Sequence, residues 1–588
     1  MLSTPGATLT VSRVMIAVQP TDLRNQGKFL AETHEKVFDR LTMLIQQGLA
    51  GLNRALKRPI GKSYFDAEGR RIASVADPVL PQDAAAKNWS EDYLGGLVGG
   101  LVGNPNLASG VGYITPNGKL DSVQDMVDVV DPEKGAYYIA RATTHLDSLD
   151  QLRELRGRYD GDFAETMQYS TVRPGVGGAR YQWSASSIAT ANNSTIIQVV
   201  GVAMGRWLIQ LEGPLRMTQA GAIPDYSGST GTGNRLAMNE ALNARPHVLV
   251  DGYFGVTFDT ANLGGGLIFN NHSTMLEFSN NGKISALAHN ATIYQMLRLW
   301  DRNNCRVIAA NLDGRPDLNG ATTGEFGLGI EIRGGRNNRF ESGAIANNMW
   351  GEGYYVGHSN TTGSFRNTVF QSSKADNCRR QGMFIVSVNG LDVFSPYMIN
   401  IAGTLPQAGI DIEPNSNDDI LSGIKIYNPI TINCVGAGIV VLLGGLSGAA
   451  DKVVDINICG HVDSGSASGA YADGGNPGLG SIKGNIVFHD STWNNSKNSA
   501  FASINHGHTS AGISVLRPMA RNPNRNAGTS QTVFAVFATN RPAGSAKTYP
   551  IGNVKIVEPS VIVTSGSVPA FFSFSDHLSM AVQISWFL

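Results

Sequence analysis

Apolar and polar residues alternate in a short phrase that recurs through the middle of the chain. The phrase begins with glycine and reads GIEI at 329–332, GYYV at 353–356, GMFI at 382–385, GIDI at 409–412 and GIVV at 438–441. Alternation at every second residue is the period of a β-strand. Because the glycines are 24, 29, 27 and 29 residues apart, the phrases predict a β-solenoid in which each repeat supplies one coil.

A second sequence signal, an asparagine followed by methionine or cysteine, precedes three of these glycines at a fixed distance. Asn348-Met349, Asn377-Cys378 and Asn433-Cys434 each begin five residues before the glycine of the next phrase. The four cysteines of the chain form no CxxC pair, which argues against zinc and redox motifs. Since Cys378 and Cys434 share one repeat position, we predict free thiols stacked inside the solenoid.

The amino-acid composition favours a β protein and argues against binding to nucleic acid or to a membrane. Charged residues make up 16% of the 588 residues and glycine contributes 69 of them, which is typical of a turn-rich β protein. A formal net charge of −1 provides no field that would hold nucleic acid or an anionic membrane. No apolar run reaches about 18 residues, so we expect no membrane span. His506 and His508 lack a third ligand, and we expect neither a metal nor a cofactor.

The chain is too long for one core, so we expect several domains. Apolar residues near heptad spacing predict a helix within 26–57, which either packs on its own domain or joins copies of the chain. Glycine-rich residues 96–135 predict a linker, and 136–212 predict a small β module between glycine-rich turns. We expect the solenoid from 213 to 540 and a C-terminal β extension at 541–588.

Two phrases, QPTDLRNQGKFLAETHEKVFDRLTMLIQQ and YFDAEGRRIASVADPVLPQDAA, follow each other within residues 8–95. They resemble the virion-attachment end of tail fibres and tailspikes from short-tailed bacteriophages. Further along, TQAGAIPDYSGSTGTGNRLAMNEAL at 218–242 resembles the first segment of pectate-lyase-like β-helix proteins. Its helix, from about Arg235 to Leu242, would cover the open end of the solenoid, where strand edges and apolar interior are otherwise exposed.

The resemblance implies a mainly β tailspike, an elongated homotrimer whose central domain is a right-handed parallel β-helix. Residues 1–95 would be the virion-attachment segment, and 541–588 would stabilise the trimer. The implied partners are phage tail proteins and a bacterial capsular or O-antigen polysaccharide. The implied location is the virion tail, acting at the host cell surface. Such a spike would depolymerise the polysaccharide, by glycoside hydrolysis as our preferred chemistry; a polysaccharide lyase and a non-catalytic receptor-binding spike are the alternatives.

The phrase GIDIEP carries the main candidate chemistry. If Ile410 and Ile412 point inward, Asp411 and Glu413 point outward together, about 6–7 Å apart along the strand. The outward neighbours on adjacent coils are apolar, and a carboxyl pKa rises where apolar groups exclude water. Paired carboxylates serve as acid and base in glycoside hydrolysis. Glu352, just ahead of the GYYV strand, is a third candidate.

The same outward surface carries groups suited to other roles. For lyase chemistry, Tyr355, His358 or Arg380 could abstract a proton next to a uronate carboxylate. Saccharide rings stack on aromatic faces, and arginine binds acidic groups through paired hydrogen bonds. The predicted substrate-binding residues are therefore Trp350, Phe384, Arg379, Arg380, Glu331 and Arg333.

Overall fold

The computed structural model describes residues 14, 16–18, 31–69, 71–80, 83–85, 87–99, 112–114, 120–122, 143–361, 363–474, 481–504, 510–540, 552–564, 568 and 570–575. The chain divides into two units, Met1–Asp128 and Val129–Leu588, and each is described by itself. The pair His506 and His508, and most of the predicted linker at 96–135, lie outside the described residues.

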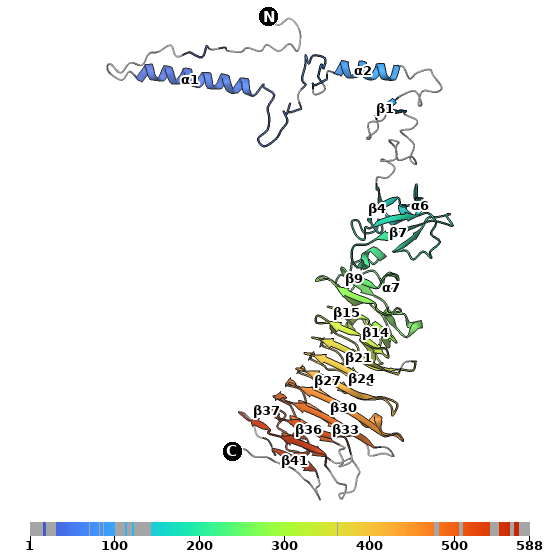
Figure 1. The fold of residues 1–588 in the computed structure, drawn as a ribbon. Helices are drawn as coiled ribbons and strands as arrows, with labels where there is room; N and C mark the ends of the chain where they lie inside the picture. The colour runs from blue at the N-terminus through green and yellow to red at the C-terminus, as the bar shows by residue number, and fades with distance from the viewer. Residues whose placement is uncertain are drawn as a thin grey trace. The chain divides into compact units, whose positions relative to one another are not determined.

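The described part of the N-terminal unit contains two helices and a hairpin (Figure 1). Helix α1 spans Ala31–Leu52, α2 spans Lys87–Gly99, and β1 (Gly112–Ile114) pairs antiparallel with β2 (Leu120–Ser122). The apolar stripe of α1 is exposed along its length and consists of Phe38, Leu41, Ile45, Leu49 and Leu52. The described residues of this unit therefore leave the predicted heptad face uncovered.

The second unit begins with a small five-stranded sheet of order β3-β4-β5-β7-β6. Its elements are β3 (Thr144–Ser148), α6 (Leu149–Glu154), β4 (Phe163–Gln168), β5 (Arg180–Ser184), β6 (Ile196–Gln198) and β7 (Arg206–Gln210). Trp183 and Trp207 pack in its core with ring centroids 5.3 Å apart. The indole N–H of Trp207 donates to the carbonyl of Leu155 at 2.7 Å, so this buried aromatic pair fixes the α6 end to the sheet.

Helix α7 (Arg235–Ala244) lies at the start of the solenoid, after β8 (Leu215–Arg216) and the 3-10 helix η1 (Met217–Ala220). Its residues Met238, Ala241 and Leu242 are buried in the same hydrophobic core as the first coils. The helix predicted at about Arg235–Leu242 is therefore present, and it covers apolar interior that the first coil would expose.

The rest of the unit is a parallel β-helix, as predicted, in which each coil supplies one strand to each of three faces (Figure 1). Face 1 consists of β11 (Gly265–Ile268), β14 (Ile293–Trp300), β17 (Phe326–Arg333), β20 (Glu352–Ser359), β23 (Gln381–Ile385), β26 (Ala408–Ile412), β29 (Ile439–Leu442), β32 (Ala470–Asp473), β35 (Phe501–Ile504), β38 (Phe537–Asn540) and β41 (Phe572–Ser575).

Face 2 consists of β9 (His247–Val250), β12 (Met275–Phe278), β15 (Arg306–Ile308), β18 (Arg339–Glu341), β21 (Gly363–Gln371), β24 (Val388–Phe394), β27 (Leu421–Tyr427), β30 (Lys452–Cys459), β33 (Ile482–His489), β36 (Gly512–Leu516) and β39 (Val554–Val557). Face 3 consists of β10 (Tyr253–Val256), β13 (Lys283–Ala286), β16 (Asn311–Asp313), β19 (Ile345–Asn347), β22 (Lys374–Asp376), β25 (Tyr397–Ile399), β28 (Ile430–Ile432), β31 (Val462–Ser464), β34 (Thr492–Asn494), β37 (Met519–Arg521) and β40 (Ser560–Ile562). Short helices η2 (Thr260–Asn262), η3 (Pro316–Leu318), η4 (Gly444–Leu446) and α8 (Gln531–Phe534) lie between strands.

The recurring phrases are successive strands of face 1, and they align residue for residue in the parallel pairing. Their glycine is required by the close approach of neighbouring coils. A Cβ atom added to Gly353 would lie 2.6 Å from the carbonyl oxygen of Gly382 and 2.7 Å from Cβ of Ala375. A glycine within a strand marks such a close backbone approach, which explains why it recurs once per coil.

The three asparagine marks, together with Asn400, lie at the corner that follows face 3 and are hydrogen-bonded in two pairs. Asn348, Asn377, Asn400 and Asn433 all adopt the left-handed backbone conformation, with φ between 53° and 56°, which asparagine tolerates better than most residues. The side-chain amide of Asn377 donates to Oδ1 of Asn348 at 2.8 Å, and that of Asn433 donates to Oδ1 of Asn400 at 3.4 Å. Cys378 and Cys434, the residues after two of these asparagines, are buried free thiols, as predicted.

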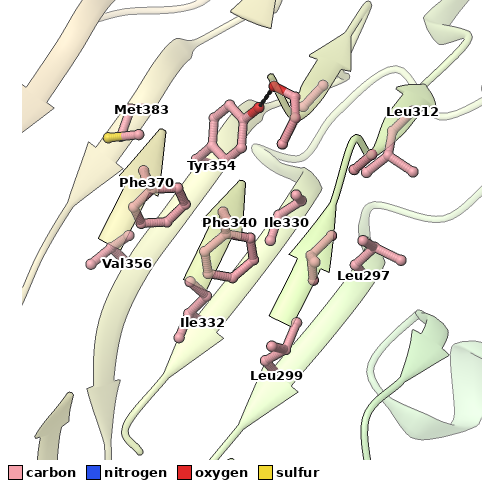
Figure 2. Close-up of a cluster of buried hydrophobic side chains, with 14 of the residues drawn as sticks. Leu297, Leu299, Leu312, Ile330, Ile332, Phe340, Tyr354, Val356, Phe370 and Met383 are labelled. Atoms are coloured by element: carbon pink, nitrogen blue, oxygen red, sulfur yellow. Dashed lines mark hydrogen bonds between the residues drawn. The ribbon is translucent and has the colours of Figure 1, made fainter. Parts of the chain in front are cut away.

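Apolar side chains from all three faces fill the interior (Figure 2). The rings of Phe340 and Phe370, from neighbouring coils of face 2, stack with centroids 4.5 Å apart, and Tyr354 of face 1 meets Phe370 edge-on at 5.7 Å. Such stacks of like residues bury the area on which a solenoid depends for its stability.

The β-helix continues past residue 540, where the sequence predicts its end. The strands β39, β40 and β41 pair in parallel with β36, β37 and β38, so they add one more coil to the same three faces. The phrases beyond 550 lack the glycine-initial pattern of the central repeat, which is why the sequence predicts too early an end to the solenoid.

Candidate active site

The side chains that point outward from face 1 form three rows along the β-helix. The glycine that begins each recurring phrase and the residue after it both point inward, so they belong to none of these rows. A Cβ on Gly409 would meet Thr431 inside the solenoid at 2.7 Å, and Ile410 belongs to the core. Relative to the glycine, row 1 is the preceding residue, row 2 the second after it and row 3 the fourth. Row 1 reads Leu328, Glu352, Gln381, Ala408 and Ala437; row 2 reads Glu331, Tyr355, Phe384, Asp411 and Val440; row 3 reads Arg333, Gly357, Val386, Glu413 and Leu442.

Much of this outward surface is nevertheless buried. Asp411 and Glu352 have no exposed surface, and Tyr355 and Phe384 are at most 3% exposed. Outward acids on a β-helix are usually solvated, so their burial here sets this stretch of face 1 apart. A carboxyl group that loses water favours its neutral form.

Asp411 is held by one hydrogen bond. Its Oδ2 accepts from the side-chain amide of Gln381 at 2.9 Å, whereas its Oδ1 has no hydrogen-bond partner among the described residues. Burial, and then the neighbouring charge of Glu413, raise the pKa of Asp411 to about 8. At neutral pH the side chain therefore carries a proton.

Glu352 is paired with arginine. Its Oε1 accepts from Nη1 of Arg380 at 2.6 Å, yet burial outweighs this pairing and raises the pKa of Glu352 to about 7. Arg380 also donates to the carbonyl of Leu405 at 3.2 Å and lies 3.5 Å from Glu325. Its guanidinium sits 5.5 Å from the ring centre of Phe384, so Arg380 bridges rows 1 and 2 beside Asp411.

Glu413 is half-buried, and burial raises its pKa while Arg380 opposes that rise. A second acid, Asp473, acts on Glu413 from two coils further along row 3 and also raises its pKa. Sequence reasoning missed Asp473 because the alignment of phrases stopped at Gly438. Extending the alignment by one period to Gly469 would have placed Asp473 in the row of Glu413.

Glu331 is tied to its neighbours by both oxygens. It accepts from Nε of Arg333 at 2.7 Å and from the indole N–H of Trp300 at 2.8 Å. Arg333 in turn lies 4.7 Å over the ring of Tyr355, whose pKa is raised by burial. Trp300 was not predicted, because its strand has Met296 where the later phrases have glycine.

The remaining predicted residues lie around this cluster. Arg379 stacks 3.8 Å over the ring of Trp350 at the corner before β20, and burial lowers the pKa of Arg379. His358 lies beyond row 3, where β20 pairs antiparallel with β21. Within the described residues, no hydrogen bond or ion pair joins His358 to Asp411, Glu413 or Glu352.

Among the residues that the structure describes, no group of three or more His, Cys, Asp or Glu side chains is arranged to hold a metal ion. In the same part of the chain, no helix has the length and apolar character needed to cross a membrane.

No protein-family model matches this chain. A curated relative, the tail spike protein of Salmonella phage epsilon15, is 49% identical over 96 residues, which is 16% of this chain and 9% of that protein. The match confirms the resemblance to phage tailspikes over that segment, and the chain spans less than a tenth of this relative's length.

Several solved structures are similar in fold. The tailspike gp49 of Acinetobacter baumannii bacteriophage Fri1, a capsular polysaccharide depolymerase, is 14% identical with a TM-score of 0.43 over 72% of this chain and 76% of that one. The glycan biofilm-modifying enzyme WceF of Pantoea stewartii is 13% identical with a TM-score of 0.41 over 80% and 57%. An endo-xylogalacturonan hydrolase of Aspergillus tubingensis is 15% identical with a TM-score of 0.41 over 62% and 100%. TM-scores in this range leave the fold assignment to the strand pairing of this chain itself.

Proposed function

We propose that this protein is a phage tailspike that binds a bacterial surface polysaccharide, such as a capsule, and cleaves it by glycoside hydrolysis. The observation that carries the proposal is the pair formed by Asp411, protonated and buried, and Glu413, half-buried on the same strand. We further propose that residues 1–95 attach the spike to the phage tail, that the spike is a homotrimer, and that it acts at the host cell surface.

Asp411 suits the role of general acid. With a pKa of about 8 it holds a proton at neutral pH, and a general acid needs a pKa near the working pH. Since Oδ2 already accepts from Gln381, the proton belongs on the Oδ1 side, where it can be donated to the glycosidic oxygen. The leaving sugar then departs as an alcohol.

Glu413 suits the role of general base, because its half-buried side chain is the more accessible of the two. Residues two apart on a strand lie about 6.6 Å apart. Inverting glycosidases separate their carboxyl groups by about 6.5–9.5 Å to admit a water, whereas retaining enzymes need about 5–5.5 Å. The distance of about 6.6 Å separates the two Cα atoms, and we propose that the carboxyl groups stand similarly far apart, so that Glu413 deprotonates a water that attacks with inversion at the anomeric carbon.

Arg380 suits the role of a movable cover. Asp411 has no exposed surface, so a sugar must displace a neighbouring side chain to reach Oδ1. The charge of Arg380 acts on both Asp411 and Glu413. When substrate binds, Arg380 would leave its ion pair with Glu352 and pair with an acidic group of the polymer instead. Trp350, Phe384, Arg379 and Arg333 would line the approach, with Glu331 holding Arg333 in place.

Lyase chemistry finds less support from the same residues. A Tyr355 base would need a lowered pKa, whereas burial raises it. Hydrolysis, β-elimination and simple binding are separated by incubating the protein with purified capsule of the host. Reducing ends that appear without absorbance from unsaturated uronates mean hydrolysis, both signals together mean a lyase, and neither signal means a binding spike.

The site assignment is tested with Asp411→Asn and Glu413→Gln, each of which should lower the rate by about 10²-fold or more. A matched control is Asp392→Asn, which changes an outward acid on β24 of face 2 and should retain wild-type activity. Full activity in both site variants would overturn the assignment.

A further inference from the structure

A cavity of about 480 Å³ lies on the outer surface of face 1; its floor begins one coil after Asp411, and Leu405 and Pro406 from the loop before β26 form one edge. Its floor continues rows 2 and 3 of the candidate active site. Val440 pairs with Asp411, and Leu442 follows Glu413 in row 3. Tyr471 and Ile504 extend these rows over the next coils. A chain bound across the acid pair would therefore run directly into this cavity, which we call the apolar groove.

None of the described residues that line the apolar groove is charged, and the row-3 residue between Leu442 and Ile504 is the acid Asp473. Its polar groups are the Tyr471 hydroxyl and the side chains of Ser468, Asn498 and Asn540. Ligand pockets typically enclose about 300–1,000 Å³ and combine a mainly apolar lining with a few polar groups that fix orientation. The groove fits that description, and its amide and hydroxyl groups can pair with sugar hydroxyls.

The opposite side of the acid pair has a different chemistry. There Arg298, Arg333 and Arg380 lie over the rings of Trp300, Tyr355 and Phe384. Arginine stacked on aromatic rings can bind an acidic sugar, whereas the described residues that line the apolar groove offer no counter-charge for one. Burying an unpaired carboxylate is costly, so the groove selects against uronates.

We propose that the apolar groove over β29, β32, β35 and β38 binds an uncharged sugar residue that carries a methyl group, as an acetyl or 6-deoxy substituent. The methyl group would pack on Val440, Leu442 and Ile504, and the apolar face of the ring would stack on Tyr471. This inference rests on the proposed function for the position of the cleaved bond, and it deepens that function by naming the sugar class on one side of it.

Binding can be measured independently of cleavage. The full-length protein is mixed with N-acetylglucosamine, rhamnose, glucose or glucuronic acid as the free sugar, so that only the first two carry a methyl group, and saturation transfer is recorded by NMR. We expect transfer to the acetyl and deoxy methyl groups, weaker transfer to glucose and none to glucuronate. The acetyl and deoxy probes also distinguish the two sources of the methyl group. Because no bond is broken, a protein that fails to cleave capsule still gives a readable result.

Tyr471→Ala should weaken binding of the methyl-bearing probes about tenfold, the effect of losing an aromatic contact of about 1.4 kcal/mol. Tyr471→Phe keeps the ring and should bind like wild type if stacking dominates. The matched control is Tyr427→Ala, which removes a tyrosine from face 2 that stacks on Phe394.

Unchanged methyl signals in Tyr471→Ala would overturn the inference, as would glucuronate binding as strongly as the acetylated probe. A third contrary outcome is a change in oligomeric mass without loss of sugar binding, which would make the groove an interface between copies of the chain. Light scattering on the same samples measures that mass.

Discussion

The side-chain amide of Gln381 donates a hydrogen bond to Oδ2 of Asp411 at 2.9 Å, across two neighbouring coils of face 1. Both side chains are fully buried. Burial raises the pKa of Asp411 to about 8, and the Gln381 amide opposes that rise because an N–H donor stabilises the charged carboxylate. The amide therefore tunes the protonation of the proposed acid.

Gln381→Met should move the alkaline limb of the activity profile upward. In the wild type, kcat/KM should fall as the pH rises through about 8, where Asp411 loses its proton. Without the amide, the pKa of Asp411 rises and activity persists to higher pH. The measurement is the release of reducing ends between pH 5 and 10. Gln295→Met changes another buried glutamine of face 1 and should leave the limb in place; an unmoved limb in Gln381→Met would contradict this assignment.

Asp411→Asn should make the protein more stable at alkaline pH while it removes activity. The pKa of Asp411 is about 8 in the folded protein and 3.8 for the side chain free in water, so the folded state holds a proton that the unfolded chain releases. Stability thus falls as the pH rises from about 4 to 8. One pKa unit corresponds to about 1.4 kcal/mol, so the gain at pH 9 should be on the order of a few kcal/mol. Thermal melting at pH 4 and pH 9 measures it, and equal gains at both pH values would refute the explanation.

Arg380→Met should destabilise the protein more at pH 8 than at pH 5. It leaves Glu352 buried without its partner, and breaking such a pair typically costs about 3–5 kcal/mol. Since the pKa of Glu352 is about 7, the carboxyl is largely neutral at pH 5 and the loss is smaller there. Melting temperatures of Arg380→Met, Glu352→Gln and the double variant form a double-mutant cycle. The double variant should recover part of the loss; additive losses would show that the two groups do not interact.

Gly353→Ala should destabilise the β-helix by about 1–3 kcal/mol, the usual cost of overpacking. The added methyl group meets the backbone of Gly382 and the side chain of Ala375, neither of which can rotate away. Gly444→Ala is the matched control, because a Cβ there meets nothing within 4 Å. Denaturant unfolding of the two variants should differ clearly, and equal stability would show that the coils can separate to admit a methyl group.

The interior of the β-helix could be predicted from sequence because its pattern is local. Ile410 and Ile412 alternate with outward residues on one strand, and the glycine of each phrase fixes the register with the next coil. The asparagine marks were visible for the same reason. Both follow from contacts that recur between neighbouring coils, so each phrase carries the information for its own placement.

The burial of the outward acids could not be predicted in the same way. The charge of Arg380, from the corner of one coil, acts on Asp411, and Arg380 is itself anchored to Leu405 from the corner of the next. These corner residues follow no period. The same holds for Glu331, whose indole partner Trp300 lies 31 residues earlier on a strand without the glycine mark.

Asn348, Asn377, Asn400 and Asn433 give one corner of successive coils the same backbone conformation. The lengths of other connections still differ, and the loops 400–407 and 413–420 lie on either side of β26. In a solenoid built this way, the residues that fix the strand register are different from the residues of the corner loops. The loops can therefore change during evolution without altering the register. In the proposed tailspike, corner loops could be exchanged one coil at a time to follow a changing host coat, while the strand register and the acids on the floor stay where they are.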